Sequence, residues 1–122
     1  MPAALVVDDN RQTANSVCRM LELLGITARP AYGPRAAILH IERFIPDVVF
    51  LDINMPGVTG FDLMTYLRRD PRLENVHMVV ITSDDQPDTA RRAHDTGALS
   101  ILIKPIGMED LERVLRKIGM VV

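Results

Sequence analysis

Short apolar runs alternate along the chain with segments whose apolar residues recur every three or four positions. A short, continuous apolar run is typical of a strand that is buried on both faces, and the longer spacing is typical of an amphipathic helix. The segment 11–25, for example, repeats apolar residues at Ala14, Val17, Met20, Leu21 and Leu24 and ends at Gly25. The alternation predicts strands over 4–7, 27–31, 47–52, 76–82 and 99–104, and helices over 11–25, 34–44, 60–70, 87–97 and 108–119.

Five strand–helix pairs in succession predict an α/β fold, (βα)5, in which a five-stranded parallel sheet carries helices on both faces. The second predicted strand contains Pro30, which cannot donate a ladder hydrogen bond and therefore favours an edge position. The doubly wound, flavodoxin-like strand order 2-1-3-4-5 puts that strand at an edge. The 122 residues suit one domain, so we expect residues 1–122 to form a single unit.

Polar residues stand where the predicted central strands end. The stretch PDVVFLDINMPG (46–57) shows this most clearly, because its apolar run finishes on Asp52 with a Pro-Gly turn signal behind it. The other strand ends carry Asp8-Asp9, Thr82-Ser83 and Lys104-Pro105. In an open α/β sheet, ligands bind beyond the carboxyl ends of the strands at the point where the strand order reverses. We therefore expect these residues to share one site.

The residue types at these strand ends suit phosphoryl transfer. Clustered carboxylates repel one another, and a hard divalent cation with oxygen ligands, such as Mg²⁺, relieves the repulsion. Asp8, Asp9 and Asp52 would serve as its ligands, with a backbone carbonyl from the turn after Asp52. Lys104 offers an ammonium group to a phosphate, and Thr82 offers a hydroxyl donor. A carboxylate can itself be the nucleophile, and Asp52 is the central candidate.

The ordered set of strand ends resembles the receiver domain of two-component response regulators, over essentially the whole chain. The resemblance rests on the segments LVVDDN (5–10), VVFLDINMPGVTG (48–60), VVITS (79–83) and ILIKP (101–105). It implies a phosphorylated signalling domain, not an enzyme, that catalyses its own phosphorylation and dephosphorylation. It implies a histidine kinase or a histidine phosphotransfer protein as the phosphate donor.

The resemblance also implies individual roles. The residue matching Asp52 accepts the phosphate, those matching Asp8 and Asp9 hold Mg²⁺, and the one matching Asn54 gives it a backbone carbonyl. Those matching Thr82 and Lys104 contact the phosphoryl group. Phosphorylation is expected to change the face formed by the fourth helix, the fifth strand and the fifth helix, and hence the binding of an output partner or a fused output domain.

Two further expectations concern the end of the fifth strand. The peptide bond before the position of Pro105 is usually cis in this family, so we expect a cis Lys104–Pro105 bond. Three residues before the lysine, receivers usually carry a Tyr or Phe that moves together with the threonine, but here Ile101 occupies the position. We therefore expect Thr82 and Ile101 to form the switch pair, with a smaller or differently routed output change.

Three alternatives remain in view. A phosphatase of the haloacid-dehalogenase type needs an acid two residues after the nucleophile, where this chain has Asn54, which cannot donate a proton in that way. A receiver-like module that never carries phosphate would be expected to lose an acidic or lysine position, and all are present. A nucleotide-binding flavodoxin-like protein would need a Gly-rich phosphate loop after a strand, and no predicted strand is followed by one.

Composition limits the expected cellular location and the classes of binding partner. The formal net charge of −2 and the pI near 5.9 give no basic footprint for nucleic acid. Cys18 is the only cysteine, as suits a reducing compartment, and no run of apolar residues is long enough to cross a membrane. The N-terminus lacks a basic region of the kind that precedes a secretory signal. We therefore expect a cytoplasmic protein with no direct nucleic-acid or membrane partner.

Overall fold

The computed structural model describes residues 3–121 and contains one parallel sheet in the predicted order, β2-β1-β3-β4-β5. The strands are β1 (Ala3–Val7), β2 (Thr27–Ala31), β3 (Val48–Asp52), β4 (His77–Thr82) and β5 (Ser100–Ile103). The helices are α1 (Arg11–Leu23), α2 (Pro34–Arg43), α3 (Gly60–Arg68), α4 (Pro87–Asp95) and α5 (Met108–Lys117), with a short 3-10 helix η1 (Pro71–Leu73). The predicted doubly wound (βα)5 fold is confirmed.

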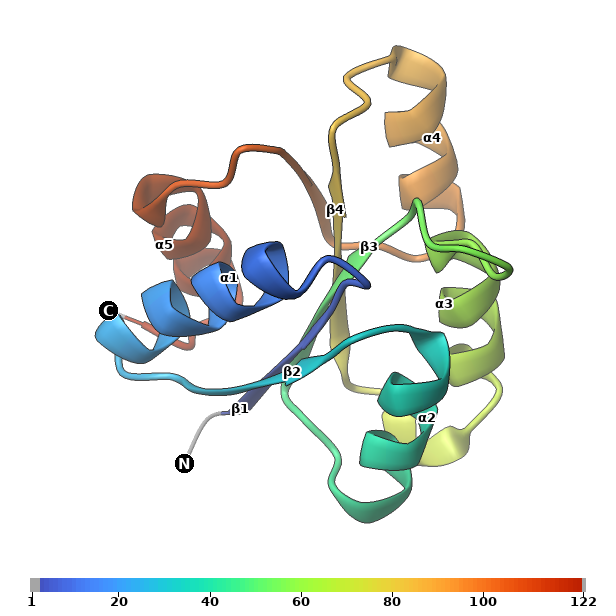
Figure 1. The fold of residues 1–122 in the computed structure, drawn as a ribbon, viewed down its shortest axis with the longest axis horizontal. Helices are drawn as coiled ribbons and strands as arrows, with labels where there is room; N and C mark the ends of the chain where they lie inside the picture. Colours follow the sequence, from blue (N-terminus) through green and yellow to red (C-terminus); the bar gives the residue numbers. More distant parts are fainter. Residues whose placement is uncertain (1–2, 122) are drawn as a thin grey trace.

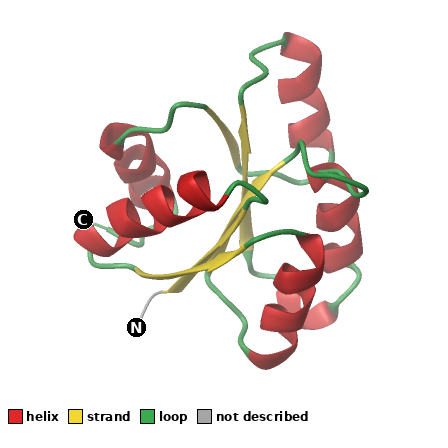
Figure 2. Ribbon diagram, in the orientation of Figure 1, coloured by secondary structure: helices red, strands yellow, loops and turns green. Residues whose placement is uncertain are grey.

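Helices cover both faces of the sheet (Figures 1 and 2). One core packs α1 and α5 against residues such as Val6 and Phe50, and the other packs α2, α3 and α4 against residues such as Leu5 and Leu51. Successive strand residues point to opposite faces, so the fully apolar runs are buried on both sides. β2 lies at an edge, as Pro30 predicts, and Pro30 stands opposite Val6 in the register.

The main differences from the predicted elements lie at helix ends. α1 ends two residues before Gly25, which takes a positive φ of 85° in the turn that follows. α3 ends at Arg68 rather than at residue 70, because Asp70 begins a new element: its side chain accepts from the backbone N–H of Arg72 and caps η1. This short helix is not among the elements predicted from the sequence.

No helix among residues 3–121 is long and apolar enough to cross a membrane.

The start of α3 is seated directly on the end of β3 through Gly60. A Cβ atom at this position would lie 2.5 Å from the backbone oxygen of Asp52 and 2.7 Å from the Cα of Ile53. Real Cβ atoms do not approach backbone this closely, so any side chain here would push α3 away from the strand end. Glycine is required at this position by the contact and not by its φ angle.

We therefore expect Gly60→Ala to lower the free energy of unfolding by about 3 kcal/mol, as an overpacked buried site does. Helix propensity alone would give a gain of about 1 kcal/mol, so the sign of the change is diagnostic. Urea denaturation measures it. Gly107→Ala is the matched control, because its Cβ would meet nothing closer than 3.8 Å. Equal stability of the two variants would contradict the seating of α3.

Candidate functional site

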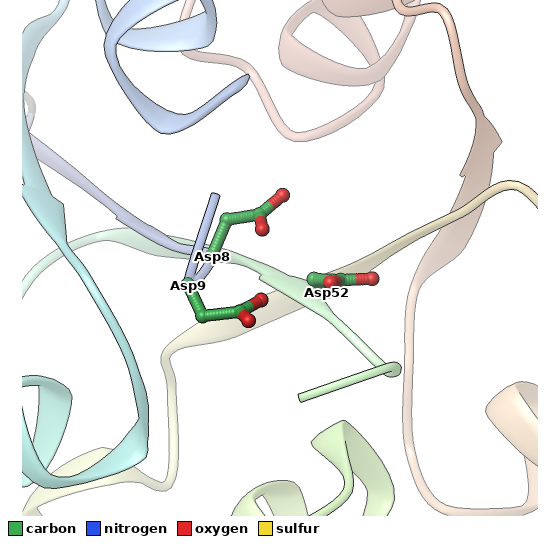
Figure 3. Close-up of side chains that lie close together, drawn as sticks. All are labelled: Asp8, Asp9 and Asp52. Atoms are coloured by element: carbon green, nitrogen blue, oxygen red, sulfur yellow. The ribbon is translucent and has the colours of Figure 1, made fainter. Parts of the chain in front are cut away.

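Three carboxylates meet at the carboxyl ends of the two strands that flank the switch in strand order. Asp8 and Asp9 follow β1 directly, and Asp52 is the last residue of β3. The register aligns the ends of β1 and β3, with Val7 opposite Leu51, so the acidic residues that follow emerge side by side. One oxygen from each carboxylate lies within 4.8 Å of the others, and Figure 3 shows the three side chains gathered above the sheet edge.

Burial differs sharply among the three side chains. Asp8 is fully buried and Asp52 is 4% exposed, whereas Asp9 is exposed to solvent. Each buried carboxylate accepts a hydrogen bond from a backbone N–H two residues further on: Asp8 from Asn10 at 2.9 Å, and Asp52 from Asn54 at 3.2 Å. These bonds hold the side chains but leave most of their negative charge uncompensated.

Lys104 is the one cation that forms an ion pair with this cluster among the described residues. Its Nζ lies 3.0 Å from Asp8 and 3.7 Å from Asp52, from the loop after β5. One positive charge faces three carboxylates, so the group as a whole remains strongly negative. Burial raises the pKa of Asp52 above its ordinary value, and the carboxylates of Asp8 and Asp9 raise it further. The Asn54 N–H and Lys104 oppose this rise.

The donor set fits a hard divalent cation. Asp8 and Asp9 supply carboxylate oxygens from the loop after β1 and Asp52 supplies them from the end of β3; Asp9 is solvent-exposed, and a cation with retained waters could enter from its side. Burial is the main cause of the raised pKa of Asp52 and the neighbouring carboxylates add to it, and a bound cation would favour the ionised form of all three. Asn54 lies in the loop directly behind Asp52 and is exposed, so this loop can supply a further ligand.

Thr82 and Lys104 stand next to each other at the same edge. Thr82 is the last residue of β4 and is fully buried, and its backbone oxygen accepts from the backbone N–H of Lys104 at 2.7 Å. The Lys104–Pro105 peptide bond is cis, as the resemblance implies. Lys104 and Thr82 thus reach the rim that carries the three carboxylates, so the structure brings together all the predicted strand-end residues.

Ile101 lies apart from this cluster. It pairs with Val80 in the middle of the β4–β5 ladder, is partly buried, and packs against the core under α2, α3 and α4. The next residue, Leu102, packs into the core on the opposite face of the sheet. Ile101 therefore lies two positions before Ile103, the ladder partner of Thr82, and its role as a switch partner of Thr82 stays a prediction.

One feature of the site was missed in the sequence analysis: a chain of hydrogen bonds that joins Thr82 to α4. The hydroxyl oxygen of Thr82 accepts from the backbone N–H of Asp84 at 3.0 Å. The carboxylate of Asp84 accepts from the N–H of Gln86 at 2.9 Å and from the hydroxyl of Thr89 at 2.6 Å. These bonds lower the pKa of Asp84 and hold the first turn of α4.

The segment TSDDQPDT (82–89) contains a local signal for these hydrogen bonds. Thr and Asp that accept from the N–H two residues ahead form turns, and a proline at the first helical position marks a helix start. The signal predicts a turn before α4 but does not specify which hydroxyl the second carboxylate oxygen would reach.

Comparison with known proteins agrees with this architecture. The model of the response regulator receiver domain family matches residues 4–116. The probable methanogenesis regulatory protein FilR2 of Methanothrix harundinacea is 34% identical over 93% of this chain and 79% of its own length. The two-component response regulator ORR13 of Oryza sativa subsp. japonica is 29% identical over 96% of this chain and 98% of its own.

Solved structures lead to the same family. The chemotaxis protein CheY4 of Vibrio cholerae superposes with a TM-score of 0.90 at 26% identity, covering 96% of this chain and 98% of that one. The fold, the family match and the conjunction of strand-end residues agree along almost the whole length of the chain. The chain belongs to the response regulator receiver domain family.

Proposed function

We propose that this receiver domain accepts a phosphoryl group on Asp52 from a phosphohistidine of a histidine kinase or a histidine phosphotransfer protein. The observation that carries the proposal is the position of Asp52, a nucleophilic carboxylate between two further carboxylates and a lysine at the switch point of the sheet. One oxygen of Asp52 attacks phosphorus, the P–N bond breaks, and the imidazole leaves with the electron pair and takes up a proton.

Mg²⁺ is the proposed cofactor, held by Asp8, Asp9 and Asp52 with the backbone carbonyl of Asn54. When bound, it would neutralise the carboxylates and draw charge from the phosphoryl oxygens. Two side chains of the protein would contact the phosphoryl group itself. Lys104, already within 3.7 Å of Asp52, would pair with the incoming phosphoryl group, and Thr82 would donate its hydroxyl to a phosphoryl oxygen.

The acceptor role is tested by intact-protein mass after incubation with acetyl phosphate, in Mg²⁺ and in EDTA. We expect one phosphoryl adduct in Mg²⁺, none in EDTA, and none in Asp52→Asn. Asp85→Asn serves as a control, because Asp85 is an exposed carboxylate after β4. An adduct on Asp52→Asn, or an adduct that forms equally in EDTA, would contradict the proposal. If wild type gives no adduct, a beryllofluoride titration tells fast hydrolysis from a domain that does not bind phosphate.

The uncompensated negative charge of the buried carboxylates gives a second test. Without a cation, Asp52→Asn removes a buried charge whose pKa is raised, so in EDTA at neutral pH it should raise the free energy of unfolding by about 1 kcal/mol. Asp8→Asn removes the closer partner of Lys104 and should give no such gain. Mg²⁺ should stabilise wild type more than Asp52→Asn, because the variant has lost a ligand. Urea denaturation checks all three, and a loss of stability in Asp52→Asn would refute the argument.

We further propose that the output change leaves the site through α4 rather than through β5. If Thr82 turns its hydroxyl toward a phosphoryl group, the bond from the Asp84 N–H must lengthen or the start of α4 must follow. Ile101 has no hydroxyl and is partly buried against the core. The body of α4 is held to α3, because the guanidinium of Arg92 stacks 4.4 Å above the ring of Phe61. The movement is thus directed to the first turn of α4.

Backbone NMR shifts with and without beryllofluoride check this route. We expect the largest changes beyond the site in residues 82–90 and small changes in β5. Asp84→Ala removes both carboxylate bonds and should reduce the changes within α4 while leaving beryllofluoride binding intact. Large chemical-shift changes in β5 and α5, with none in α4, would contradict the proposal that the output change passes through α4.

A further inference from the structure

The face formed by α2 and α3 carries an apolar groove that the proposed phosphoryl chemistry does not use. The two helices lie side by side on one face of the sheet (Figure 1), with a groove of about 590 Å³ between their first turns. A second hollow of about 310 Å³ continues it toward their last turns, and both are lined by Ile38 and Tyr66. The groove therefore runs along the whole helix pair.

The walls of this groove expose large apolar side chains. Leu39 on α2 is 54% exposed, Tyr66 on α3 is 53% exposed, and Val58 at the upper rim is 38% exposed. Side chains of this kind, gathered along one groove rather than scattered, mark an interaction surface.

The charges on the two walls follow one pattern with opposite signs. On α2, Arg35 is followed four residues later by Leu39 and seven residues later by Glu42. On α3 and its C-cap, Asp62 is followed four residues later by Tyr66 and seven residues later by Arg69. Residues spaced by four and seven lie on one side of a helix, and all six line the groove. From the N-terminal to the C-terminal end, the α2 wall is positive, apolar and negative, and the α3 wall is negative, apolar and positive.

None of these four charges forms an ion pair within the part of the chain that the structure describes, although Glu42 lies near enough to Arg72 to attract it. Ion pairs form elsewhere, including the neighbouring pair Asp70–Arg72 at 2.6 Å, but none includes Arg35, Glu42, Asp62 or Arg69. Their side chains also form no hydrogen bond with residues 3–121, so they are available to a partner.

We propose that this groove is the interface of a weak two-fold dimer between copies of this chain. Alternating charges at four corners around an apolar strip are complementary to the same face of a second copy. A two-fold axis along the groove sets Arg35 against the second copy's Asp62, and Glu42 against the second copy's Arg69. An axis across the groove sets Arg35 against the second copy's Glu42. Either arrangement buries Leu39 and Tyr66 and pairs every charge.

Helix length limits the strength of such a dimer. α2 has ten residues and α3 has nine, so each is about 15 Å long. The face is smaller than the roughly 800 Å² per partner of a standard stable interface, and a dissociation constant above about 10 µM is expected.

Sedimentation velocity of wild-type protein from about 5 to 500 µM tests the proposal. We expect a reversible rise from monomer toward dimer. Leu39→Ser should weaken the association about tenfold, whereas Leu23→Ser, at an exposed leucine on α1 across the sheet, should not change it. Arg35→Glu should weaken it similarly, and Arg19→Glu on α1 is the control of equal charge change.

Mixing two weakened variants identifies the axis and separates contacts between copies from contacts within one. Arg35→Glu mixed with Asp62→Arg restores both ion pairs if the axis runs along the groove. Arg35→Glu mixed with Glu42→Arg restores them if the axis runs across it. Recovery of dimer in either mixture supports the proposal. A monomer at every concentration, or a dimer that neither Leu39→Ser nor Arg35→Glu weakens, would overturn it, whatever the outcome of the phosphorylation tests.

Discussion

The central constraint in this molecule is the excess of negative charge at the carboxyl edge of the sheet. Asp8 and Asp52 are buried because they continue strands that are apolar on both faces, and Asp9 stands beside them. Lys104 offsets only part of the charge, at 3.0 Å from Asp8 and 3.7 Å from Asp52. Three carboxylates that share one lysine could hold a metal ion, whose charge would offset theirs.

The fold holds this arrangement in place from beneath. A one-residue slip in register would move every side chain of a strand into the opposite core, so the packing of the two cores fixes the ends of β1, β3 and β4 relative to one another. The close contact between Gly60 and the backbone of Asp52 fixes α3 against the same edge. The site residues lie at the ends of strands or in the loops directly after them, so their positions are set by the sheet.

The strands and their order could be predicted because their signals are local and strong. Apolar runs such as Val48–Leu51 have one good explanation, and Pro30 specifies an edge. Helix ends were less predictable, because capping by a side chain such as Asp70 competes with the apolar period that suggests a longer helix. The meeting of the strand-end residues could be predicted from topology alone. The sharing of Lys104 between two carboxylates, and the reach of Asp84 to Thr89, could not, because each depends on side-chain packing across loops.

Two structural connections join the site to the surface, one from the end of β4 and one from the end of β3. After β4, Thr82 and Asp84 connect the edge to the first turn of α4 by hydrogen bonds. After β3, the loop from Asp52 continues through Val58, at the rim of the α2–α3 groove, and returns at Gly60 to touch the backbone of Asp52. Because this loop is closed on itself by backbone contact, a change at Asp52 that moves it moves the groove rim as well. The two connections emerge on separate surfaces, α4 and the α2–α3 groove. If Asp52 is phosphorylated as proposed, the added charge would act on both the start of α4 and the proposed dimer groove without any rearrangement of the sheet.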